Sequence, residues 1–206
     1  MTVDGLSRTL DAFAQRLRDL GAPVVDHLRP GLSEQEIDEI SAVCGGRLTP
    51  EARAWWAWHD GDRERYNDDW GRPSLVPWLV FCGLRGALEQ SAGFRDIMTA
   101  VGHQEEGYVP DPRGEDALFY RQYVTLLQDQ RPLVMDCRHP DAPDAPVGFY
   151  TTDGGIWSFR TFTEQIGWWN WALDNRFWIL GPDGDWGEDP ERSPGLLIGR
   201  HVNDHV

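Results

Sequence analysis

Apolar residues recur at helical spacing near the start of the chain. The first stripe repeats at steps of four, three, four and three residues, and it consists of Leu6, Leu10, Phe13, Leu17 and Leu20. This spacing lines one face of a helix, so it predicts an amphipathic helix that packs on a core. The Gly-Ala-Pro sequence at residues 21–23 predicts where that helix ends.

Two further helices are predicted from their capping residues. A Ser-Glu-Gln-Glu sequence begins at Ser33 and has the pattern of a capping box, in which the serine and the last glutamate each accept a backbone N–H from the other. We expect this helix to end at glycines 45–46. The next helix has Thr49 as its cap and Pro50 in its first turn, and its pattern continues to His59. The segment from His59 to Trp70 has no periodicity, so it predicts a solvated loop.

The rest of the chain contains apolar segments of other kinds. Pro77 interrupts an apolar run at residues 75–81, which predicts an edge strand or an irregular buried segment, and residues 84–101 fit a helix. Four β-rich runs follow at residues 122–128, 133–137, 147–152 and 156–160. An Asp-Gly-Gly turn joins the last two runs, and we expect the Pro-rich connection at residues 139–146 to stay out of the sheet interior.

A closing helix is predicted after these strands. Thr161 and Glu164 repeat the capping-box pattern, and Ile166, Trp169 and Leu173 give the helix a face that would be buried against the sheet. Helices come first, then strands, then a helix, without the alternation typical of a parallel sheet. The sequence therefore predicts an α+β fold in which N-terminal helices pack beside an antiparallel β-meander.

The length and composition fit one folded domain. The chain has 206 residues, of which 40% are hydrophobic, so it can bury a core. We expect this domain at residues 1–180. The remaining residues, 181–206, predict an acidic, loosely ordered C-terminal tail that Trp186 would hold to the domain.

The charge balance narrows the range of partners. Thirty-four acidic residues against nineteen basic ones give a net charge of −15. This charge would repel a phosphate backbone and attract a basic protein, so we expect a protein partner and no nucleic acid. All nineteen basic residues are Arg, which excludes chemistry that needs a lysine amine.

The cysteines and histidines predict neither disulfides nor a metal site. Cys44, Cys82 and Cys137 form no CxxC pair, which fits a reduced, cytoplasmic protein, and no apolar stretch has the length of a signal core or membrane span. His201 and His205 are four residues apart but lack a third ligand, and the acidic tail lacks the spacing of a calcium loop. We expect no metal and no other cofactor.

No catalytic constellation is evident, and we expect a protein that is not an enzyme. Cys137 and His139 are two residues apart, which leaves open a cysteine-dependent hydrolase. A buried, inert cysteine is the better interpretation, because no glycine-rich oxyanion turn accompanies it. His59 and Asp60 could form an acid–base pair, but a histidine at a helix C-terminus is also favoured by the helix dipole.

Two acidic segments are the candidate binding surface. Residues 60–70 and 183–191 each combine five carboxylates with one tryptophan. Charges of this kind accelerate the encounter with a basic protein, and an aromatic ring supplies desolvated contact area. The candidate partner-binding residues are Asp60, Asp62, Glu64, Asp68, Asp69, Trp70, Asp183, Asp185, Trp186, Glu188 and Asp189. The alternative is that both segments only keep the protein soluble.

Two stretches of the chain contain capping, turn and strand features in a distinctive order. In residues 28–61 these features are Pro30-Gly31, Ser33, Gly45 or Gly46, Leu48, Pro50 and Asp60-Gly61. In residues 133–162 they are a strand ending in Asp, a loop, Pro146-Val147-Gly148, a second strand, Asp153-Gly154 and Phe162. The order and spacing of these features resemble the SUKH superfamily of fungal cell-wall-synthesis regulators and bacterial immunity proteins, and the resemblance extends over about residues 6–180.

The resemblance implies a non-enzymatic domain that binds proteins. Bacterial members of the superfamily are largely immunity proteins that neutralise toxins, often nucleases, delivered between competing cells. An acidic chain suits the basic site of such a toxin. The alternative that the resemblance allows is a regulatory or signalling scaffold of the cell-wall-synthesis-regulator type.

Overall fold

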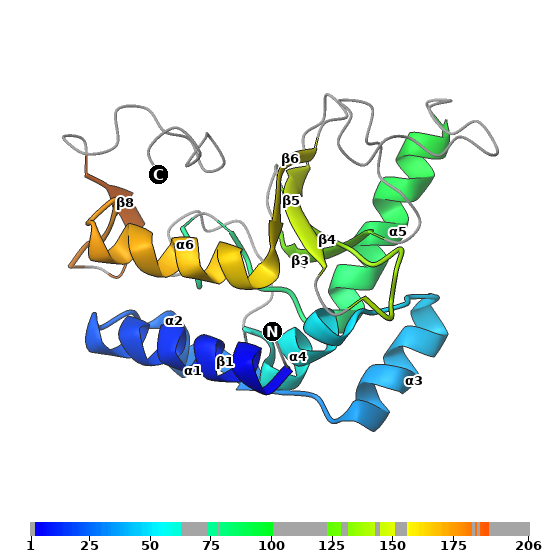
Figure 1. The fold of residues 1–206 in the computed structure, drawn as a ribbon, viewed down its shortest axis with the longest axis horizontal. Helices are drawn as coiled ribbons and strands as arrows, with labels where there is room; N and C mark the ends of the chain where they lie inside the picture. Colours follow the sequence, from blue (N-terminus) through cyan, green and yellow to red (C-terminus); the bar gives the residue numbers. More distant parts are fainter. Residues whose placement is uncertain are drawn as a thin grey trace.

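Helices and an antiparallel sheet make up the fold, as the sequence predicts. A computed structural model gives the structure of residues 3–62, 74–77, 79–100, 123–128, 132–142, 145–150, 156–182, 184 and 186–189. Within these residues, helices precede a four-stranded antiparallel sheet, and a closing helix and a two-stranded hairpin follow it (Figure 1). The architecture is therefore α+β.

The three predicted N-terminal helices are confirmed. They are α1 (Val3–Asp19), α3 (Glu34–Cys44) and α4 (Pro50–Trp58). The capping box is formed, because Ser33 Oγ accepts the backbone N–H of Glu36 and the Glu36 carboxylate accepts that of Ser33. Gly45 ends α3 with φ +73°, a conformation that costs glycine nothing. Thr49 caps α4 by accepting the backbone N–H of Ala52 at 3.2 Å.

The chain after α4 corrects the sequence prediction. His59 lies outside α4, in extended backbone, and begins a strand, β2 (His59–Asp62). This strand pairs antiparallel with β1 (Leu28–Pro30), which follows the one-turn helix α2 (Val24–His27). The expectation of a loop from His59 is thus wrong for β2, and residues 63–70 of that loop lie outside the described residues. Two strands this short carry no periodic pattern that a sequence could reveal.

The predicted meander is confirmed, with one correction. The strands are β3 (Tyr123–Leu127), β4 (Leu133–Asp136), β5 (Pro146–Tyr150) and β6 (Ile156–Thr161), in the spatial order β3-β4-β5-β6. The sequence analysis places the connection that ends at Pro146 outside the sheet interior, yet Pro146 is the first residue of β5, which lies between β4 and β6, and it pairs with Thr161. A strand tolerates proline at its first residue. The Asp-Gly-Gly turn lies outside the described residues.

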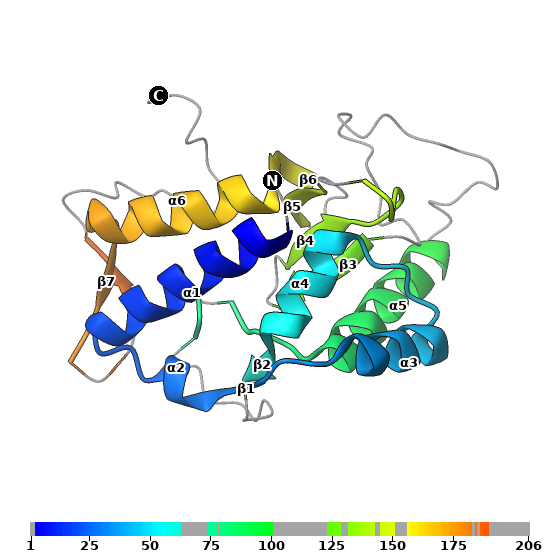
Figure 2. The ribbon, with the colours of Figure 1, turned by 60° about the horizontal axis from the view of Figure 1, so that its bottom comes forward.

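Two helices flank the sheet. The helix α5 (Leu84–Ala100) packs along β3, where buried Ser91 Oγ accepts the backbone N–H of Thr125 at 3.1 Å. The helix α6 (Phe162–Asp174) follows β6 directly, and the capping box of Thr161 and Glu164 starts it. In both views α6 lies beside α1, and α3 lies on the outer side of α5 (Figures 1 and 2).

A cluster of aromatic rings fills the core between α1, α4 and α6. Trp55 is fully buried, with ring centroids 4.2 Å from Phe81, 5.1 Å from Phe162 and 6.5 Å from Trp169. Trp169 in turn lies 5.6 Å from Phe13 of α1. As predicted for α6, Ile166, Trp169 and Leu173 are buried.

The C-terminal segment contains folded structure that the sequence did not predict. The strands β7 (Trp178–Leu180) and β8 (Trp186–Glu188) form an antiparallel hairpin. The expectation of a loosely ordered tail from residue 181 is therefore wrong for β8. Residues 190–206 lie outside the described part of the chain.

Replacing Trp169 with alanine should lower the free energy of unfolding by about 3–5 kcal/mol, because a large buried ring leaves a cavity. Trp171 on the same helix is 40% exposed, so Trp171→Ala is the matched control and should cost less than about 1 kcal/mol. Urea unfolding measures both values. Equal losses in the two variants would contradict the placement of Trp169 at the centre of the core.

Candidate functional site

Asp60, the first residue of the first acidic segment, is bound inside the fold. Its Oδ1 accepts the backbone N–H of Leu84 at 2.8 Å, and its Oδ2 lies 3.2 Å from Nη2 of Arg29. The Asp60 side chain is only 19% exposed. Asp60 therefore caps the N-terminus of α5 from the neighbouring strand, where the helix dipole also favours a negative charge.

The backbone around Asp60 is closely packed. Gly61 has φ +81°, and a Cβ there would lie 2.5 Å from the backbone nitrogen of Gly83. Only glycine combines this conformation with so close an approach of two backbone segments. The backbone N–H of Asp62 donates to Phe81 O at 3.1 Å. The start of the first acidic segment is thus fixed against the residues that lead into α5.

Cys82 lies next to this contact and bridges to the sheet. Its thiol donates a hydrogen bond to Gln128 Oε1, with Sγ and Oε1 2.9 Å apart. Burial and the nearby Asp62 carboxylate raise the pKa of Cys82 to about 12. The thiol is therefore neutral at physiological pH and acts as a hydrogen-bond donor.

Trp186 joins the second acidic segment to the end of the first. Its Nε1 donates to Ser74 O at 2.7 Å, and Ser74 is the first described residue after the first segment. The half-buried Trp186 ring lies 6.4 Å from that of Trp178, and buried Gly184 packs against Pro23. This hydrogen bond places Trp186 of the second segment beside Ser74, which follows the last residue of the first segment by four positions.

The other predicted residues of this surface are placed only in part. Asp62 and Asp189 are half-buried, and Glu188 is in β8. Six of the predicted residues lie outside the described part of the chain, namely Glu64, Asp68, Asp69, Trp70, Asp183 and Asp185.

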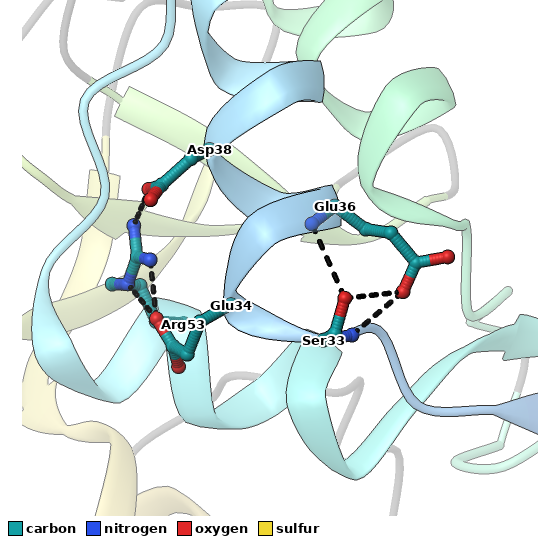
Figure 3. A network of polar contacts seen from close by, with 5 residues as sticks. All are labelled: Ser33, Glu34, Glu36, Asp38 and Arg53. Atoms are coloured by element: carbon teal, nitrogen blue, oxygen red, sulfur yellow. Dashed lines mark hydrogen bonds and ion pairs between the residues drawn. The ribbon is translucent and has the colours of Figure 1, made fainter.

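The helix α3 forms a second acidic surface that the sequence analysis did not select. Glu34, Glu36, Asp38 and Glu39 are all exposed. Arg53 of α4 binds both Glu34 and Asp38, with 2.8 Å between its Nη1 and Asp38 Oδ1 (Figure 3). Hydrogen bonds from Ser33 lower the pKa of Glu36. The density of charge along the sequence could have revealed this helix, because the four carboxylates fall within six residues.

The two residues of the alternative catalytic pair, Cys137 and His139, differ in burial. Cys137 is fully buried and His139 is exposed. Burial raises the pKa of Cys137 to about 12, so its thiol is neutral and a poor nucleophile. Among the described residues, no group of three or more His, Cys, Asp and Glu side chains could hold a metal ion. His201 and His205 are not among those residues.

Comparison of the chain with models of known protein families gives no match, and comparison with curated proteins gives none. In the part of the chain that the structure describes, no helix is both long and apolar enough to cross a membrane.

Removing the carboxylate of Asp60 should destabilise the domain. Asp60→Ala should lower the free energy of unfolding by about 1–2 kcal/mol, because α5 loses its cap. Asp60→Asn keeps an oxygen that can accept the Leu84 N–H and loses only the ion pair with half-exposed Arg29, so it should cost less. Urea unfolding of both variants measures this order, and equal costs would contradict the capping role.

Alkylation should distinguish the three thiols. Cys82 and Cys137 should react with iodoacetamide far more slowly than in unfolded protein, because their raised pKa values leave little thiolate at neutral pH. The pKa of each of these two thiols is higher in the folded than in the unfolded protein, so the thiol protons stabilise the fold. This stabilisation is fully present below pH 9.0, the ordinary thiol pKa, and is lost as the pH rises toward about 12. Mass spectrometry of the peptides gives each rate, with half-buried Cys44 as the internal control. Fast native labelling of Cys137 would revive the hydrolase alternative.

Proposed function

We propose that the chain is a non-enzymatic protein-binding domain of the SUKH superfamily that acts in the bacterial cytoplasm as an immunity protein. Its partner is a basic toxin domain, of which a nuclease is the leading example. The net charge of −15 and the resemblance of two stretches to the superfamily support this proposal.

One observation carries the choice of surface. The hydrogen bond from Trp186 to Ser74 joins the second segment to the chain four residues after the end of the first, which supports one surface formed by both segments. The binding surface then consists of Asp62, Glu64, Asp68, Asp69 and Trp70 of the first segment. The second segment contributes Asp183, Asp185, Glu188 and Asp189. Asp60 and Trp186 support the surface from within the fold, because their polar groups bind Leu84 and Ser74.

The physics of association supports an acidic inhibitor of a basic enzyme. A nuclease must attract phosphates, so its site carries positive charge, which an acidic protein can cover. Opposite charges raise the rate of encounter by long-range attraction, and salt screens this effect. An immunity protein benefits from a fast encounter, since it must bind the toxin before the toxin acts.

Co-expression with the product of the adjacent upstream gene tests the proposal. We expect the two proteins to co-purify, and we expect the chain to restore growth to cells that express the partner. If the chain does not restore growth to cells that express a toxic partner, the immunity function is contradicted. A partner that is neither toxic nor basic would contradict it as well. In the latter case the regulatory scaffold is favoured.

Neutralising the proposed surface should slow association with this partner. The variant Asp62→Asn, Glu64→Gln, Asp68→Asn, Asp69→Asn should lower the association rate constant about tenfold or more at low salt and reduce its salt dependence. The control variant Glu39→Gln, Glu89→Gln, Asp96→Asn, Asp141→Asn removes four exposed carboxylates elsewhere. It changes the net charge equally and should have a much smaller effect. Surface plasmon resonance measures both, and equal effects would place the interface outside this surface.

A further inference from the structure

Trp171 is the one exposed tryptophan among those whose side chains the structure describes. It lies on α6 and is 40% exposed. Trp56, Trp58 and Trp186 each donate their indole N–H to another group of the fold. In the described part of the chain, by contrast, no group accepts a hydrogen bond from the Trp171 indole. Much of this side chain is therefore available to a partner.

The surface of α6 is open beside the Trp171 ring. Gly167 lies four residues earlier, on the same face of the helix, and a Cβ at this position would meet no atom within 4 Å. Half-buried Phe177 packs on the ring, with 5.0 Å between the two ring centroids. Phe177 thus holds the Trp171 ring in place, while the helix surface at Gly167 leaves room for another side chain.

The second acidic segment lies next to this ring. The backbone N–H of Asp189 donates to Phe177 O at 3.4 Å, and Phe177 is the residue that packs on Trp171. Both views show the C-terminal end of α6 beside the β7–β8 hairpin (Figures 1 and 2). Residues 171–189 contain five carboxylates and one arginine, so the charge around the ring favours a basic partner.

We propose that Trp171 is the aromatic anchor of the second acidic segment, on which a basic protein partner places an arginine or lysine side chain. The face of the indole ring attracts the cation, and the apolar stem of the same side chain covers the ring. One turn further along α6, Asp174 binds the guanidinium of Arg16, so this end of the helix already holds a basic side chain. Trp186 was expected as the anchor, but its indole is bound to Ser74 inside the fold.

The inference rests on the proposed function for the identity of the partner, and it adds a second kind of contact to the acidic surface. Carboxylates accelerate the encounter, whereas a ring that becomes desolvated on binding slows dissociation. The Trp171 contact should therefore be separable from the effect of charge, because its removal leaves the net charge unchanged.

Binding of a hexa-arginine peptide to the full-length chain tests this contact. Trp171→Ala and Trp171→Leu should each weaken binding about two- to fivefold, because both remove the aromatic face and neither changes the net charge. Trp171→Phe keeps an aromatic face and should lose less. Gly167→Gln fills the space beside the ring and should also weaken binding. The matched control is Val43→Ala on α3, since Val43 is 74% exposed and its truncation should leave the affinity unchanged. Isothermal titration calorimetry at low salt measures each affinity.

Circular dichroism checks that each variant is folded. Wild-type affinity in Trp171→Ala or Trp171→Leu would overturn the inference, and so would an equal loss in Val43→Ala. Failure of the peptide to bind the unaltered chain would overturn it as well. The immunity function fails separately: a chain that binds the peptide through Trp171 but protects no cell from the upstream gene product would contradict that function and keep this contact.

Discussion

Burial of the Trp55 ring is the interaction on which the arrangement of the helices depends. Trp55 belongs to α4, yet its neighbours Phe81, Phe162 and Trp169 come from segments before α5 and within α6. Phe13 extends the cluster to α1 through Trp169. Tilted and edge-on rings at these distances gain both buried area and favourable quadrupole contacts. Because each element supplies one face of the same ring cluster, none of them can shift without opening a cavity.

The acidic composition is compatible with this core because several carboxylates have defined structural partners. Buried Glu51 accepts the backbone N–H of Ala145 at 2.7 Å, which holds the β4–β5 connection on α4. Buried Asp136 binds Arg138 with both oxygens. A buried charge is tolerated only when such partners compensate the loss of water. The excess charge therefore concentrates in the exposed carboxylates, where it can act on a partner.

Local signals predicted most of the fold. Ser33, Thr49 and Thr161 marked helix starts correctly, because each cap is decided by side-chain and backbone groups three residues apart. The β1–β2 pair was missed because its register is set by tertiary packing, and β8 was missed because Gly187 and the Asp residues on either side of the strand are typical of loops. Of the candidate surface, the sequence selected the segments but not the contact between Trp186 and Ser74, since no pattern encodes a pairing 112 residues apart.

The cap that Asp60 provides to α5 has a consequence for how the domain opens and closes. An N-terminal cap usually lies next to its helix, so the helix can form alone, whereas here the capping carboxylate is 24 residues away in β2. The first turn of α5 is complete only when β2 is in place, and β2 in turn pairs with β1. We therefore expect these three elements to open as one cooperative unit, so that amide protons of β1, β2 and the first turn of α5 exchange with similar protection.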